Sequence, residues 1–213
     1  MATTTPKLAG EHAAPAWYPT HGVDGSELTF AEDADGSLRR ACDAAAALVA
    51  EMQAGRPARW LTLTGNRGSG KTSLAAEIFR QARRINPGSA SMWIGDRRRP
   101  RCVWFDETEF AAAIETDTRL PEYLADDYLV VIDDVGSARE RWDRVADALF
   151  RLANARLGKW MVWTSNLTVK GIEDKVDGRL ASRLQRDVAP GVRNMGVRIT
   201  APDYALRNRK LAA

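Results

Sequence analysis

The stretch Gly65-Asn66-Arg67-Gly68-Ser69-Gly70-Lys71-Thr72 matches the pattern G-x-x-x-x-G-K-[ST] at every specified position. Its three glycines let the backbone wrap closely, so that amide N–H groups point inward at phosphate oxygens. We expect Lys71 to reach the β- and γ-phosphates of ATP and the Thr72 hydroxyl to ligate Mg²⁺. The pattern therefore predicts a P-loop in which all eight residues contribute to ATP binding.

The neighbouring sequence supports this interpretation over a chance match in a glycine-rich turn. A short apolar strand is predicted at residues 60–64 and a helix at about 70–83, so the loop joins a strand to the positive end of a helix. Further strands are predicted at 102–105, 128–132, 160–164 and 197–200. Helices are predicted from Ser37 to about Met52, at about 138–157 and at about 172–185. One or two short helices are also predicted between the strand at 102–105 and Asp127. Alternating strands and helices predict an α/β fold with a parallel sheet, and the continuously apolar strand 128–132 is expected at its centre, adjoining the P-loop strand.

Two carboxylates follow that apolar strand. Asp133 ends it, and a carboxylate there can orient Mg²⁺ and its waters. Asp134 is a candidate general base for the attacking water. An apolar run ending in two aspartates is otherwise typical of a strand entering a turn. Its place about 60 residues after a P-loop favours the functional interpretation.

Polar residues later in the chain allow two interpretations each. Trp163-Thr164-Ser165-Asn166 end the strand predicted at 160–164, and a polar residue there can hold the attacking water or contact the γ-phosphate, although Thr-Ser-Asn is also ordinary turn chemistry. Arg179 and Arg183 share one helical face, either as a solvated surface or as an arginine finger that reaches a neighbouring subunit's ATP site. The basic run at 97–101, near Trp93 and Trp104, can be a surface for single-stranded DNA or a solvated loop.

Composition narrows the function classes further. The net charge is only +3, but residues 179–213 hold seven arginines and one lysine against two aspartates, which suits either an acidic partner or a solvated basic surface.

Two cysteines without a CxxC pair, and two histidines near the N-terminus, predict a reducing cytoplasm and no metal site built on Cys or His. No apolar run approaches the roughly 20 residues of a membrane span, so a cytoplasmic protein without membrane contact is expected. Residues 1–28 lack periodicity and are expected to be flexible, while their Trp17-Tyr18-Pro19 is either a docking peptide or packs on the domain.

Several blocks together resemble the AAA+ ATPases of the DnaC/DnaI helicase-loader and IstB group. Besides the P-loop they are Val131-Ile132-Asp133-Asp134-Val135-Gly136, Leu152-Ala153-Asn154-Ala155-Arg156, Thr164-Ser165-Asn166-Leu167, Arg179-Leu180-Ala181-Ser182-Arg183-Leu184 and Asp203-Tyr204. The resemblance implies a P-loop NTPase of the AAA+/ASCE type with a five-stranded parallel sheet flanked by helices, and the P-loop strand near its centre. It also implies that Asn166 is the sensor-1 residue and Arg179 the arginine finger, with Arg183 beside it. Such ATPases assemble head to tail into homo-oligomers whose ATP sites lie at subunit interfaces, and they bind single-stranded DNA.

The expected organisation is a leader at 1–28, an AAA+ ATPase domain at 29–205 and a basic tail at 206–213, with no C-terminal lid domain. The expected function is Mg²⁺-dependent ATP hydrolysis by a DNA-replication protein of the helicase-loader type, with single-stranded DNA and a replicative helicase as partners. The few residues before the first helix leave an alternative open, an IstB-like helper ATPase whose partner is a transposase. A small-molecule P-loop kinase would explain the P-loop but neither Asn166 nor the arginine pair.

Overall fold

The computed structural model describes residues 35–86, 93–94, 97–98, 101–137, 142–189 and 191–202. Only the backbone is described at 93–94, 97–98, 142 and 188–189. The predicted leader at 1–28 and tail at 206–213, including Trp17-Tyr18-Pro19, and Arg99 of the basic run lie outside these ranges. The domain limits at residues 29 and 205 therefore stay predictions.

A five-stranded sheet forms the centre of the fold, and all its strand pairs are parallel. Its strands are β1 (Trp60–Gly65), β4 (Cys102–Asp106), β5 (Leu129–Asp133), β6 (Trp160–Ser165) and β9 (Met195–Ile199). These are the five predicted strands, each confirmed within a few residues. The predicted α/β class with a five-stranded parallel sheet is confirmed.

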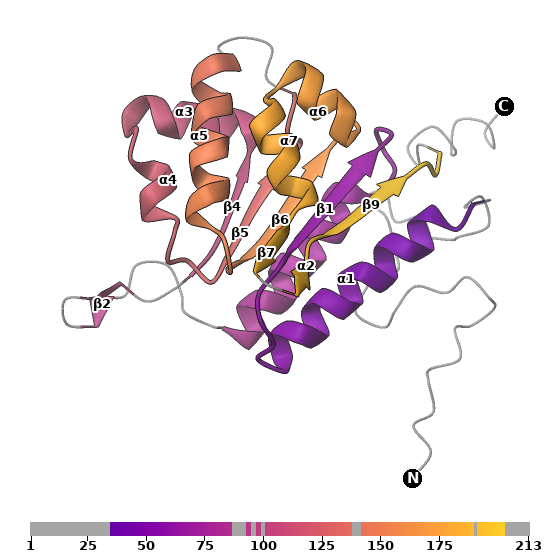
Figure 1. Cartoon of the computed structure of the whole chain (residues 1–213). Coiled ribbons are helices and arrows are strands. Elements are labelled where there is room, and N and C mark those ends of the chain that lie inside the picture. The colour runs from indigo at the N-terminus through magenta and orange to yellow at the C-terminus, as the bar shows by residue number, and fades with distance from the viewer. Residues whose placement is uncertain are drawn as a thin grey trace, which may run out of the picture.

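Helices cover both faces of this sheet (Figure 1). On one face lie α1 (Ser37–Gln53) and α2 (Lys71–Ile85). The opposite face carries α3 (Glu107–Thr116), α4 (Leu120–Tyr123), α5 (Trp142–Ala155), α6 (Val169–Lys175) and α7 (Gly178–Gln185). None of the described helices has the length and apolarity that a membrane crossing requires.

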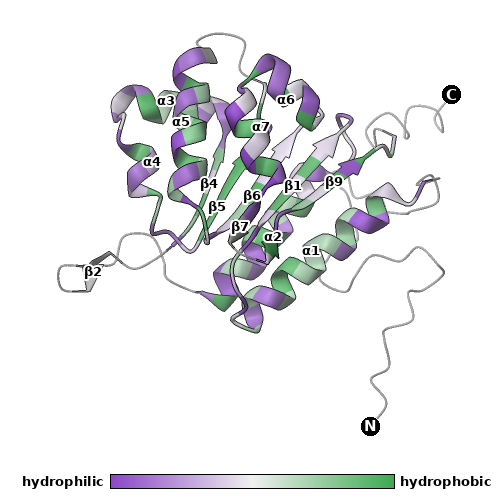
Figure 2. Cartoon of the chain, in the orientation of Figure 1, coloured by the Kyte–Doolittle hydropathy of each residue, from purple (hydrophilic) through white to green (hydrophobic). Residues whose placement is uncertain are grey.

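Strand periodicity explains why the interior strands are apolar throughout. Successive side chains of a strand point to opposite faces, so Val130 belongs to the core cluster that includes residues of α3 and α5, whereas Val131 belongs to the cluster that includes residues of α1 and α2. The interior strands β1, β5 and β6 are buried along their whole length, while the edge strands β4 and β9 are half-exposed. In Figure 2, β5 is coloured mostly as hydrophobic, and the helices carry both hydrophobic and hydrophilic residues.

The strand order corrects one expectation. The order is β4-β5-β6-β1-β9, so β6 is central and separates β5 from the P-loop strand β1. The expectation that β5 is the central strand and adjoins β1 is therefore wrong. Apolar periodicity shows that a strand is covered on both faces, but it carries no information about which interior strands are neighbours.

Three local features also differ from the sequence-based expectation. The predicted single helix at 172–185 is two helices, α6 and α7, because the Asp177 carboxylate accepts the N–H groups of Arg179 and Leu180 at 2.6 and 3.1 Å and begins a new helix there. The region predicted as a loop at 85–101 contains a small antiparallel hairpin of β2 (Trp93–Ile94) and β3 (Arg97–Arg98). A second hairpin, β7 (Asp187–Ala189) with β8 (Val192–Arg193), precedes β9 and was not predicted.

Candidate functional site

The predicted P-loop joins β1 to α2 as a tight turn rich in positive φ angles. Gly65, Gly68 and Gly70 have φ of 133°, 66° and 91°, which side-chain-bearing residues rarely adopt. At Gly65 an added Cβ would lie 1.9 Å from the carbonyl oxygen of Ile199, so glycine is also required for the loop to approach β9. The loop ends at the first turn of α2, whose N–H groups have no acceptor within the helix.

Lys71 is the first residue of α2, and its side chain folds back into the loop. It is 5% exposed, and its Nζ donates hydrogen bonds to the carbonyl oxygens of Gly65 and Asn66 at 3.0 and 2.5 Å. Ser69 closes the same turn, with its Oγ donating to the Asn66 carbonyl at 2.8 Å. A single ammonium group is thus held at a fixed place beside the amides of the loop.

The Asn66 side chain bonds outside the loop, and the Arg67 side chain is at the surface. The Asn66 side chain donates to the carbonyl oxygen of Thr200 at 3.3 Å, and its backbone N–H donates to that of Ile199 at 3.3 Å. Asn66 therefore anchors the loop to the end of β9. Arg67 is exposed to solvent.

Asp133 ends β5 and contacts the first turn of α2. The Thr72 hydroxyl donates to its Oδ1 at 3.1 Å, and the Thr164 hydroxyl, from the end of β6, donates to the same oxygen. Burial raises the pKa of Asp133 above its ordinary value, and the hydrogen bonds from Thr164 and Thr72 partly oppose that shift. The two residues predicted to hold Mg²⁺, Thr72 and Asp133, are thus in direct contact.

Asp134 has an unusual backbone and is held next to Asn166. Its φ of 58° is the one positive value among the described non-glycine residues. Such a conformation costs about 1–3 kcal/mol and persists where the surroundings hold it. Asn166 donates from its side-chain amide to the Asp134 carboxylate, and the Asp134 N–H donates to the Thr164 hydroxyl at 2.8 Å.

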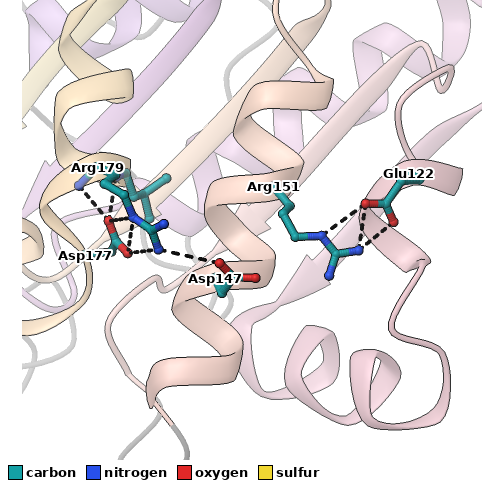
Figure 3. A network of polar contacts seen from close by, with 6 residues as sticks. Glu122, Asp147, Arg151, Asp177 and Arg179 are labelled. Carbon is teal, nitrogen blue, oxygen red and sulfur yellow. Dashed lines mark hydrogen bonds and ion pairs between the residues drawn. The ribbon is translucent and has the colours of Figure 1, made fainter.

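Arg179 lies on a different surface, beside α5 and α7 (Figure 3), and Arg183 approaches the same Phe150 ring of α5. The Arg179 guanidinium pairs with Asp177 at 2.8 Å and with Asp147 of α5 at 3.6 Å, and it stacks over the ring of Phe150 at 4.4 Å. The hydrogen bond to Asp177 raises the pKa of Arg179 further above its already high value. Arg183 approaches the same ring at 6.0 Å. The Arg179 side chain is 58% exposed, so it remains open to another molecule.

Searches of protein-family models and of curated proteins with this sequence gave no match. The structure does match solved structures. The DnaC helicase loader superposes with a TM-score of 0.55 over 76% of this chain and 89% of that one, at 19% identity. DnaI gives 0.57 over 86% and 89%, at 18% identity. AMPPCP-bound DnaA from Aquifex aeolicus gives 0.59 over 87% of this chain and 51% of that one, at 17% identity.

This chain has the fold of these solved structures. At these identities the likeness shows the fold alone. Within this fold, the strand order places the ends of β1, β6 and β5 side by side, and these ends carry the P-loop, Thr164 to Asn166, and Asp133 to Asp134. The site residues predicted from sequence therefore gather in one place, except the arginine pair.

The structure also gives Thr164 a specific place in the site, whereas the sequence named it only as one of several polar residues at the end of its strand. The Thr164 hydroxyl donates to Asp133 and accepts from the N–H of Asp134, so it joins the two carboxylate residues. A polar residue at the end of an otherwise apolar strand was the available signal. Its importance depends on β6 lying beside β5, which the sequence did not indicate.

Proposed function

We propose that this chain binds ATP with Mg²⁺ and hydrolyses it, as an AAA+ ATPase of the DNA-replication helicase-loader type. The observation that carries the proposal is a pair of contacts beside a glycine loop that encloses Lys71. Thr72 contacts Asp133 there, and Asp134 contacts Asn166. A nucleotide-binding loop, an oxygen pair suited to a cation and a carboxylate–amide pair thus lie at neighbouring strand ends.

The residues of the loop fit a triphosphate. Backbone amides of the loop and of the first turn of α2 would donate to phosphate oxygens, and Lys71 would add a positive charge that is already positioned by two carbonyl groups. The side chain and the backbone N–H of Asn66 are both bonded to the end of β9, so Asn66 would contribute by anchoring the loop and by holding the Lys71 ammonium through its carbonyl oxygen.

Thr72 and Asp133 fit Mg²⁺, which prefers oxygen ligands and is commonly held by one or two protein groups together with phosphates and water. Among the described residues there is no cluster of three or more His, Cys, Asp or Glu side chains that could hold a metal by itself. A magnesium ion here would neutralise charge on the phosphates. The carboxylate of Asp133 would hold it, with the Thr72 hydroxyl as the second protein ligand.

Asp134 is the proposed general base, and Asn166 the residue that orients it. The Asn166 amide fixes one carboxylate oxygen of Asp134, which leaves the other oxygen to accept the proton of an attacking water. A left-handed backbone at Asp134 turns its side chain away from the direction that β5 would otherwise give it.

Replacing Asp134 by asparagine should abolish hydrolysis without abolishing ATP binding. Asparagine has the same shape and tolerates a positive φ, but it cannot accept the proton. We expect kcat to fall about 10²- to 10⁴-fold, with the ATP dissociation constant little changed, as measured by steady-state turnover and calorimetry. Asp43→Asn, at an exposed position on α1, is the matched control and should hydrolyse ATP normally. Equal activity of the Asp134→Asn variant and the wild type would contradict the assignment of the base.

The proposed partners are single-stranded DNA and a helicase. Support comes from the fold shared with the DnaC helicase loader and with a replication initiator, DnaA, solved with AMPPCP and single-stranded DNA. Turnover stimulated by single-stranded DNA, with ADP and phosphate as the only products, is the expected result. A phosphorylated small molecule among the products would instead indicate a P-loop kinase. Recovery of a transposase rather than a helicase from the native host, with ATP present, would favour the IstB-like alternative.

We further expect the ATP sites to be completed by neighbouring subunits, with Arg179 inserted in trans. Arg179→Ala should bind ATP normally and hydrolyse it about 10³-fold more slowly or worse, the range seen for arginine fingers. Mixed with the Asp134→Asn variant, it should regain activity, because roughly a quarter of randomly formed interfaces would pair an intact Asp134 with an intact Arg179. Arg183→Ala is tested in the same way, since Arg183 lies over the same ring.

The control for these mixtures is Arg151→Ala. Arg151 is in α5, on the same face of the sheet as α7, and it forms an ion pair with Glu122 at 2.7 Å (Figure 3). The Arg151→Ala substitution therefore removes a surface ion pair comparable to that of Arg179. It should leave turnover unchanged. A mixture of the Arg179→Ala and Asp134→Asn variants that gains no activity would show that Arg179 does not act across subunits.

A further inference from the structure

Glu107 is a fully buried carboxylate that neither the P-loop nor the arginine surface accounts for. It is the first residue of α3, directly after the edge strand β4, and its exposed fraction is 0%. Its Oε1 accepts the backbone N–H of Gly136 at 3.0 Å, and its Oε2 accepts the hydroxyl of Ser137 at 3.4 Å. A buried carboxylate is costly without partners, and the partners here belong to the segment that follows Asp134.

We call residues 134–137 the Asp134 loop. Each of its four backbone N–H groups donates to a named acceptor: Asp134 to the Thr164 hydroxyl, Val135 to the Thr164 carbonyl, Gly136 to Glu107 and Ser137 to the Asp134 carbonyl. The loop is thus held from the β6 side by Thr164 and from the α3 side by Glu107.

The opposite side of the loop is closed by the residue after Asn166. Gly136 has φ of 90°, and a Cβ added there would lie 2.5 Å from Cδ1 of Leu167. The loop therefore packs between Leu167 and Glu107 with no room for a side chain at Gly136. A shift of the loop away from Glu107 is opposed by these hydrogen bonds and by the packing of Gly136 against Leu167.

We propose that Glu107 is a positioning residue for Asp134. By holding Gly136 and Ser137, it maintains the left-handed backbone at Asp134 and keeps that carboxylate against the Asn166 amide. The inference rests on the proposed role of Asp134 as general base. Glu107 accepts the backbone N–H of Gly136, so it acts on Asp134 through the backbone of the Asp134 loop.

The test compares Glu107→Met with Glu107→Gln. Methionine fills a similar volume but offers no oxygen acceptor, whereas glutamine keeps an oxygen for the Gly136 N–H and an amide for the Ser137 hydroxyl. We expect Glu107→Met to lower kcat roughly 10- to 100-fold, as for a misplacement of about 1 Å, with the dissociation constant for ATP within about twofold of wild type. Glu107→Gln should keep kcat within roughly threefold of wild type. Glu107→Ala, where a water can replace the carboxylate, is measured alongside in case the methionine variant does not fold, and it should also be slower.

Two further measurements separate positioning from a general loss of stability. Glu109→Ala is the matched control, because Glu109 lies in the same first turn of α3 but pairs with the N–H of Asp106 at 3.3 Å in the helix cap. It should lower the melting temperature without lowering kcat. The double variant Glu107→Met/Asp134→Asn should be no slower than Asp134→Asn alone, since a residue that acts only through Asp134 has nothing left to affect.

The outcomes are distinct for the two proposals. Wild-type turnover in Glu107→Met, equal slowing by Glu109→Ala, or further slowing in the double variant would overturn the positioning role. Wild-type turnover in Asp134→Asn would instead overturn the assignment of the general base, and no turnover by the wild-type protein would overturn the proposed ATPase.

Discussion

Replacing Lys71 by alanine should abolish measurable ATP binding while leaving the domain folded. The lost ammonium is 5% exposed and bonded to two loop carbonyls, so its charge is concentrated where the phosphates would lie. We expect affinity for Mg-ATP to fall about 100-fold or more, at about 1.4 kcal/mol for each tenfold. Calorimetry measures the affinity directly. Thermal unfolding with and without Mg-ATP should show that the nucleotide no longer raises the melting temperature.

Folding should survive this change because alanine is a strong helix former and Lys71 begins α2. The freed carbonyl of Asn66 lies at an exposed position, where water can bond to it. Lys159→Ala is the matched control, since Lys159 is a lysine at an exposed position outside the P-loop. Normal ATP affinity in the Lys71→Ala variant would overturn the assignment of the P-loop.

Replacing Arg156 by methionine should cause a large loss of stability. Arg156 follows α5 and is fully buried, and its guanidinium donates to the carbonyl oxygens of five residues: Leu124, Ala125, Asp127, Tyr128 and Trp160. One side chain thus ties the segment before β5 to the start of β6. We expect the free energy of unfolding to fall by about 3–5 kcal/mol, because these buried carbonyls would lose their donor. Urea unfolding followed by circular dichroism measures the change.

Burial lowers the pKa of Arg156 to about 10, which still leaves it protonated and donating at neutral pH. The matched control is Arg151→Ala, one turn earlier in the same region. Arg151 pairs with Glu122 at the surface, where its side chain is 37% exposed, and such pairs contribute about 1 kcal/mol or less. A similar loss of unfolding free energy in both variants would show that the buried hydrogen bonds of Arg156 do not stabilise the fold more than the surface ion pair of Arg151 does.

The local sequence predicted a helix or strand of this fold correctly where the spacing of apolar residues was enough to define it. In the first helix, the apolar residues recur three and four positions apart, which predicts that they share one buried side of the helix. All of them are buried in α1: Leu38, Ala41, Cys42, Ala45, Leu48, Val49 and Met52. Asp177 shows the opposite case: a continuous helix was predicted through it, but its carboxylate accepts the N–H groups of Arg179 and Leu180 and begins a new helix there.

The candidate site was predicted in part for a related reason. The eight loop residues form one continuous segment, and the spacing of its glycines and its lysine is enough to predict a phosphate-binding loop. Thr164 and Glu107 contact Asp133 and Gly136 across about 30 positions of the chain. No short pattern marks such residues, because their partners lie on other strands and helices.

The sequence by itself determined the P-loop, the apolar strands and the amphipathic helices of this protein. Each of these depends on backbone geometry or periodicity within a few residues, and local physics is enough to specify them. Only the tertiary structure decided that β6 lies between β1 and β5, that Thr164 joins Asp133 to Asp134, and that Glu107 and Arg156 hold backbone groups from distant segments. Strand order and buried polar contacts follow from how whole elements pack and satisfy one another's hydrogen bonds, which no single stretch of sequence contains.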